Sequence, residues 1–196
     1  MANSRLTNLA GSRQALQMSR QSFEWLKKKM AEIKSPGRIA TNISREPHRQ
    51  TDRFQLGGLY FFFYDPKTKA QLPYYDVFPL VLILEKYNDG FLGLNLHYLP
   101  VKYRAAFLDK LMDHAVMNEN NDIKKIRVTY DILNATRRYR EFKPCLKRYL
   151  HGHIRSKLLT VEPNEWDIAT FLPVQQFKKA KSTEVWEDSI QQIRES

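Results

Sequence analysis

The residues best suited to chemistry lie between positions 136 and 157, in the stretch TRRYREFKPCLKRYLHGHIRSK. This stretch carries eight Lys or Arg side chains and a single acid, Glu141. Guanidinium and ammonium groups bind phosphate oxygens, whereas a merely solvated helix face usually mixes cations with acids. We therefore expect contacts with the phosphates of a nucleic acid. The expected contact residues are Arg137, Arg138, Arg140, Lys143, Lys147, Arg148, Arg155 and Lys157.

A second basic group is the run Lys27, Lys28 and Lys29. It lies in a helix expected over residues 12–34, opposite part of an apolar stripe. The run is either a second phosphate contact or a plain polar face, and both interpretations stay open. No helix-turn-helix, zinc-finger, RRM or KH signature occurs in the chain. We expect contact with the nucleic-acid backbone without sequence readout, and an affinity that falls steeply as salt rises.

The same stretch holds one cysteine and two histidines, Cys145, His151 and His153, which raises the question of a zinc site. On a helix, positions 151 and 153 diverge by about 200° and cannot share a metal ion. We expect a buried cysteine with two surface histidines, no metal site and no cofactor.

Catalytic patterns are missing from the sequence. It contains no Gly-rich phosphate loop, no G-x-S-x-G elbow and no H-E-x-x-H motif. Asp76, Glu85 and Lys86 have the residue types of a metal-dependent nuclease. However, neighbouring side chains of a strand point to opposite faces, which separates Glu85 from Lys86. We expect a protein that is not an enzyme.

Helices and strands must position these residues. The helical pattern predicts short helices over residues 130–139 and 144–153, and in the second of these Lys143, Lys147 and His151 share one side. Further helices are predicted over residues 101–117, 164–171 and 183–194. Strands are predicted for residues 59–64, 77–87, 91–99 and near 156–163, with a hairpin turn at Asn88-Asp89-Gly90.

The predicted fold class is α+β: a small, curled antiparallel sheet of SH3-like or OB-like size, packed with several short helices. Aromatic residues from Tyr60 to Tyr64 occupy both faces of the first strand, so both faces should be covered. These rings are expected in the core, although stacking on unpaired bases is an alternative. Residues 1–53 are predicted to form a basic N-terminal arm and helix with a polar linker, and residues 54–196 a single compact domain.

The charge balance points to an anionic partner. The chain has 196 residues, with 32 Lys and Arg against 21 Asp and Glu, a formal net charge of +11. The surplus suits a nucleic acid or an acidic surface, and basic virion proteins share it. We find no apolar run of about 18 residues and no secretory signal, so we expect a soluble protein made inside a cell, with no membrane partner.

Two segments resemble a known family: GGLYFFFYDPKTKAQLPYYDVFPLVLILEKYNDGFLGLNLHYLPVKYRAAFLDKL, residues 57–111, and FKPCLKRYLHGHIRSKLLTVEPNEWDIATFLPVQQF, residues 142–177. They are similar to the DNA end protector proteins of T4-like tailed phages. The resemblance implies a minor head-completion protein of the virion, made in the host cytoplasm. It would sit on the end of packaged double-stranded DNA near the portal or neck and shield that end from exonucleases.

An architectural role is the alternative. A neck, tail or baseplate protein of such a phage would use the aromatic sheet and the terminal helix to contact other virion proteins. Its positive charge would then face acidic neighbours.

Overall fold

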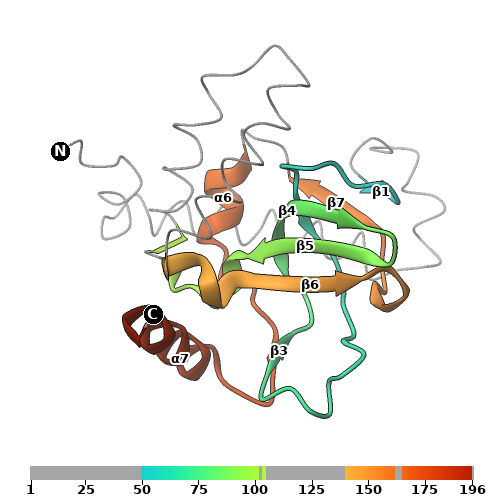
Figure 1. Cartoon of the computed structure of the whole chain (residues 1–196). Helices are drawn as coiled ribbons and strands as arrows, with labels where there is room; N and C mark the ends of the chain where they lie inside the picture. The colour runs from blue at the N-terminus through green and yellow to red at the C-terminus, as the bar shows by residue number, and fades with distance from the viewer. Residues whose placement is uncertain (1–49, 102, 105–139, 162–164, 196) are drawn as a thin grey trace.

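A computed structural model of the chain describes residues 50–101, 103–104, 140–161 and 165–195. In this part of the chain, six strands form an antiparallel sheet in the order β1-β7-β2-β4-β5-β6, and β3 pairs with β8 (Figure 1). The strands are β1 Gln50–Thr51, β2 Leu59–Phe61, β3 Tyr75–Asp76, β4 Leu80–Tyr87, β5 Gly90–Asn95, β6 Leu146–Leu150, β7 Leu158–Val161 and β8 Phe177–Lys178. The helices are η1 Leu96–Tyr98, η3 Arg140–Cys145, η4 His151–His153, α6 Trp166–Phe171 and α7 Ser182–Glu195.

The sheet is curled. β6 and β7 are far apart in sheet order, but the short connection between them requires the two ends of the sheet to approach each other. β6 is an edge strand and β7 lies near the other edge, yet only η4 and a short segment join them (Figure 1). That segment pairs with the residues just after β2 through the Tyr64–Ile154 bridge and the 2.7 Å hydrogen bond from Arg155 N to Phe63 O. The predicted α+β class with an antiparallel sheet is confirmed, while its SH3-like or OB-like character stays a prediction.

The first predicted strand buries both of its faces. Leu59 and Phe61 belong to one hydrophobic cluster, and Tyr60, Phe62 and Tyr64 belong to another on the opposite face. The Phe62 ring meets the Tyr149 ring edge-on at 5.2 Å between centroids. The expectation that these aromatic residues form core rather than stack on bases is confirmed.

The predicted hairpin at Asn88-Asp89-Gly90 is also confirmed, since β4 and β5 pair directly across it. Gly90 permits the close approach of β6 to β5. A Cβ atom at Gly90 would lie 1.9 Å from the backbone oxygen of Tyr149.

The helix predicted over residues 144–153 is wrong. Residues 140–145 form the 3₁₀ helix η3, residues 146–150 form strand β6, and residues 151–153 form η4. The stretch becomes a strand because β5 offers an edge for pairing and Tyr149 fits among the buried rings of the second cluster. Local periodicity could not reveal that edge.

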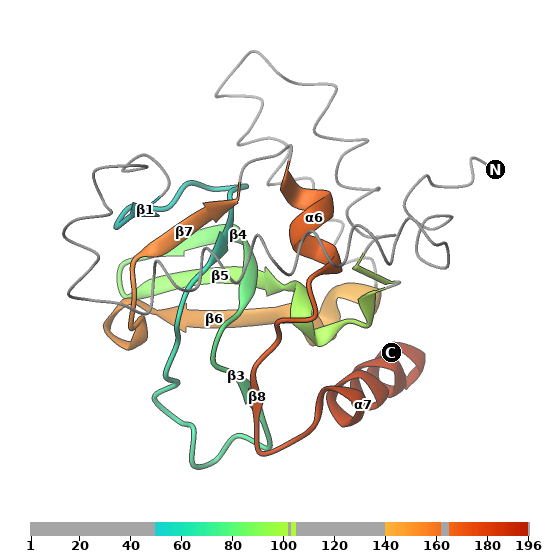
Figure 2. The same ribbon diagram turned by 180° about the vertical axis from the view of Figure 1, so that it is seen from behind.

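The C-terminal helices form as expected. Residues predicted as helix over 164–171 and 183–194 give α6 and α7, which lie away from η4 in both views (Figures 1 and 2). Helix α7 packs through buried Val185, and Trp186 Nε1 donates a 2.9 Å hydrogen bond to His97 O. No helix in the part of the chain that the structure describes is long and apolar enough to span a membrane.

Several predictions fall outside the described residues. These are nearly all of the N-terminal arm, the helix over 130–139 and most of the helix over 101–117. At the end of the predicted linker, Gln50 and Thr51 form β1 and pair with β7. The predicted late strand within residues 156–163 is confirmed as β7.

Candidate nucleic-acid interface

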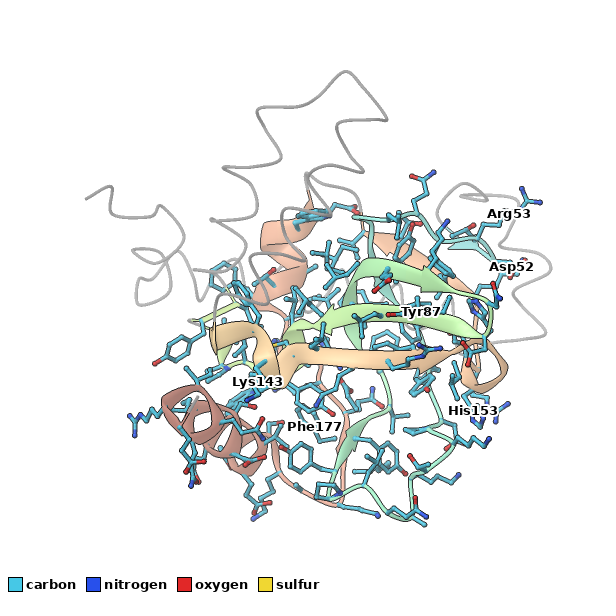
Figure 3. The ribbon with its side chains drawn as sticks, in the orientation of Figure 1. Asp52, Arg53, Tyr87, Lys143, His153 and Phe177 are labelled. Carbon is cyan, nitrogen blue, oxygen red and sulfur yellow. The ribbon has the colours of Figure 1, made fainter. Side chains whose placement is uncertain are left out.

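Three segments that are distant in sequence meet at one end of the curled sheet, here called the hairpin end: residues 52–54, residues 85–90 and residues 148–157. Figure 3 shows Arg53, Tyr87 and His153 toward this side of the molecule. The backbone N–H of His151 donates to Asp89 O at 2.9 Å. The Phe54 ring lies 5.5 Å from the His151 ring, and Lys86 Nζ lies 5.0 Å from the Phe54 ring. Folding therefore gathers cations from all three segments.

Arg148 contacts both an aromatic ring and an acid at this end. Its guanidinium carbon lies over the Tyr87 ring, 3.9 Å from the centroid, and its Nη2 atom pairs with Asp89 Oδ1. Tyr87 in turn donates its hydroxyl hydrogen to Glu85 at 2.7 Å. Strand β6 positions Arg148. In the pairing of β6 with β5, Arg148 lies opposite Leu92, close to the hairpin turn. The contacts hold the guanidinium in a defined place while 41 % of the Arg148 side chain stays exposed.

Arg155 and Lys157 are exposed cations in the segment between η4 and β7. Arg155 Nη2 lies 3.7 Å from an oxygen of Asp65, and Lys157 Nζ lies 3.8 Å from an oxygen of Asp52. The stretch 136–157 has only one acid of its own, but the tertiary structure supplies others from distant segments. Exposed pairs of this kind contribute roughly 0–1 kcal/mol, so a phosphate group can compete for the cations.

Lys147 does not share a side with Arg148, because neighbouring residues of a strand face opposite ways. Its ammonium nitrogen lies 4.2 Å from the centroid of the Tyr98 ring, in a partly buried position. Burial lowers the pKa of Lys147. Lys143, in η3, is exposed. The helix on which the predicted shared side of Lys143, Lys147 and His151 rested does not form.

The remaining predicted contacts lie beyond the described side chains. Lys27, Lys28, Lys29, Arg137 and Arg138 lie outside the described residues. Arg140 begins η3, but its side chain is not described. For these six residues the phosphate contact stays a prediction.

Sequence reasoning missed Arg53 and Tyr87, which belong to the hairpin end, and considered Lys86 only for nuclease chemistry. The turn signal Asn88-Asp89-Gly90 places the two residues before it close to the hairpin tip, and that signal could have pointed to Lys86 and Tyr87. No local signal could have found Arg53, because its segment approaches the hairpin end through Phe54, which contacts Phe91 with the ring centroids 4.7 Å apart.

The residues considered for zinc do not converge. Cys145 is buried, and burial raises the pKa of its thiol to about 12. His153 Nδ1 lies 2.8 Å from Asp65 O, and His151 packs near Phe54 and Phe91. Within the described ranges, no three His, Cys, Asp or Glu side chains are arranged to hold a metal ion.

Asp76 has the residue type of a nuclease metal ligand, but it belongs to a buried hydrogen-bond network that does not involve Glu85. Its carboxylate accepts hydrogen bonds from Phe78 N and Gln176 N, both at 3.1 Å, and from Asn95 Nδ2 at 3.3 Å. The Nδ1 atom of His97 lies 2.6 Å from the Oδ2 atom of Asp76. Burial alone would raise the pKa of Asp76, but His97 and the backbone donors outweigh it and lower the pKa. These contacts give Asp76 a structural role.

The fold and the hairpin end together define a small α+β protein with a charged, exposed surface at one end of a curled sheet. The family model of the phage T4 terminal DNA protecting protein matches residues 13–189. The chain therefore belongs to this family. Searches of curated proteins and of solved structures found no match to the chain.

Proposed function

We propose that the protein binds the ends of packaged double-stranded DNA without sequence specificity and shields them from exonucleases. The observation that carries the proposal is the family match over residues 13–189. The net charge of +11 supports it, because a protein that reads no sequence binds DNA mainly through its phosphates. The role is non-enzymatic, and its place is the virion, beside the portal or neck proteins, after synthesis in the host cytoplasm.

The proposed DNA surface is the hairpin end. Among the predicted contacts, Arg148, Arg155 and Lys157 lie there with exposed side chains, and Arg53 joins them. Lys86 also lies at this end, over Phe54, but it faces the opposite side of β4 from Tyr87, which contacts Arg148. Lys143 is exposed on η3 and is kept as an outlying contact. Lys147 is left out, because its ammonium group packs over Tyr98. For the six predicted contacts without described side chains, binding to phosphate stays a prediction.

The first test compares binding to a linear blunt duplex and to the same sequence as a closed circle, over a series of salt concentrations. An exonuclease challenge runs in parallel. We expect tighter binding to the linear form and protected ends. Equal, weak binding to both forms without protection would overturn the proposal and favour the architectural role in neck, tail or baseplate.

Charge variants then locate the surface. The double variant Arg155→Gln and Lys157→Gln should weaken binding and reduce the slope of log K against log salt by about 2, since each phosphate contact contributes about 0.9. The control removes the same charge at Lys178 of β8 and at Lys181, directly before α7. It should leave the slope unchanged. An equal reduction in both variants would place the DNA elsewhere.

A further inference from the structure

The pair formed by Arg148 and Tyr87 has the form of a stacking platform. The guanidinium carbon lies over the Tyr87 ring, 3.9 Å from the ring centroid. Asp89 contacts the Nη2 atom of Arg148, and Glu85 accepts a hydrogen bond from the Tyr87 hydroxyl. The platform is thus fixed in place by neighbours before any ligand arrives.

The contact with an aromatic ring favours a base as the partner of Arg148. Arg148, Arg155 and Lys157 each pair with an Asp side chain, but the guanidinium carbon of Arg148 also lies over the Tyr87 ring. Guanidinium planes stack on bases as they do on aromatic side chains. The Arg148 side chain is 41 % exposed, so a base can reach the guanidinium group.

Only an end of a DNA duplex exposes the flat face of a base pair. Inside the duplex, and everywhere in a closed circle, each base pair is covered by its neighbours. A stacking surface, in addition to phosphate contacts, would therefore let a sequence-blind protein select ends. The hydrogen bond from His151 N to Asp89 O joins the platform to η4, and Arg155 and Lys157 lie in the segment between this helix and β7.

We propose that Arg148, supported by Tyr87, stacks on the terminal base pair of a duplex end, while Arg155 and Lys157 bind the adjoining phosphates. This inference rests on the proposed function and adds to it the feature that distinguishes an end from internal DNA. It assigns selectivity to Arg148 and affinity to the neighbouring cations.

The test uses a blunt duplex and the same duplex closed at both ends by hairpin loops, which keeps the stem phosphates and covers the terminal pairs. The full-length wild-type protein should bind the blunt form more tightly. The variant Arg148→Lys keeps the charge but loses the plane, and should reduce this preference by about tenfold. The matched control Arg155→Lys keeps charge at a phosphate contact and should change the preference by less than about twofold.

A fluorescent base reports stacking directly. A 2-aminopurine at the terminal pair should change its emission when wild-type protein binds, and an internal 2-aminopurine should not. The change should disappear with Arg148→Lys and with Tyr87→Leu, and persist with Tyr87→Phe, which keeps the ring. Thermal unfolding of each variant checks that the fold is retained.

The two proposals fail in different ways. If wild-type protein neither prefers linear DNA to circles nor protects ends, the proposed function is overturned. If it prefers and protects ends but Arg148→Lys retains both the preference and the terminal fluorescence change, only the stacking platform is overturned.

Discussion

Replacing Asp76 by Asn tests the buried network that joins β3 to the end of β5 and to η1. The carboxylate accepts hydrogen bonds from two backbone N–H groups and from Asn95, and contacts His97 Nδ1 at 2.6 Å. An Asn side chain has nearly the same shape but only one acceptor oxygen. If that oxygen keeps the backbone donors, its amide N–H₂ group faces two other donors.

The expected loss follows from the groups left without partners. His97 could instead accept at Nδ1, but its proton would then move to Nε2, which has no hydrogen-bond partner among the described residues. Each buried donor left unsatisfied costs roughly 1–3 kcal/mol. With the Asn95 donor also disrupted, we expect Asp76→Asn to lower the free energy of unfolding by about 3 kcal/mol.

Urea denaturation at neutral pH measures this change, with Asp65→Asn as the control. Asp65 is 37 % exposed, so the same chemical change there should cost less than about 1 kcal/mol. A loss at Asp76 no larger than the loss at Asp65 would refute the network as described.

Measurements at lower pH add a second arm to this experiment. Burial lowers the pKa of His97 below its ordinary 6.5, so below that pH the unfolded chain takes up a proton that the folded chain refuses. Stability should fall as the pH drops below 6.5. Below about 3.8 the lowered pKa of Asp76 adds a further loss, because the unfolded carboxyl group is protonated first. The variant Asp76→Asn should lack that further loss, and a wild-type stability that stays constant from pH 7 to 5 would contradict the buried neutral His97.

Further substitutions and one labelling reaction test separate features of the fold. Lys147→Met should leave the salt dependence of DNA binding unchanged, and a reduced salt slope would show that Lys147 contacts phosphate. The same variant should leave the urea midpoint unchanged or higher, because it removes a partly buried charge. Gly90→Ala should destabilise the protein by more than about 2 kcal/mol in urea, since its Cβ would meet the Tyr149 oxygen at 1.9 Å, while Gly152→Ala, with nothing within 4 Å, should cost less than about 1 kcal/mol. The thiol of Cys145, whose pKa burial raises to about 12, should react with a thiol reagent at pH 8 only after denaturation, and rapid labelling of the native protein would contradict its burial.

Sequence reasoning worked where local pattern and tertiary environment agree. The alternation of Leu59, Tyr60, Phe61 and Phe62 predicted a strand with two covered faces, and the two hydrophobic clusters confirm it. The Asn-Asp-Gly signal predicted the β4–β5 hairpin, because these residue types adopt the backbone conformations of tight hairpin turns. The terminal helix was predictable from its apolar spacing.

The candidate site was predictable only in part. The cationic character of residues 136–157 is a property of composition, and the sequence alone reveals it. The direction of each cation depends on the local conformation. A helix would have placed Lys147 and Arg148 close together, whereas strand β6 sends Lys147 over Tyr98 and Arg148 over Tyr87. Pairing with β5, a contact between distant segments, decides between these outcomes.

The sequence by itself determined that the chain is basic and that it has an aromatic core strand followed by a tight hairpin. It also determined that the 136–157 stretch carries eight cations with a single local acid, Glu141. Only the tertiary structure decided which acids accompany them. Asp52, Asp65 and Asp89 come from other segments and meet Lys157, Arg155 and Arg148 because the sheet curls and η4 returns the chain to β2. Charge is fixed residue by residue, but the field at a surface depends on which distant residues the fold brings together.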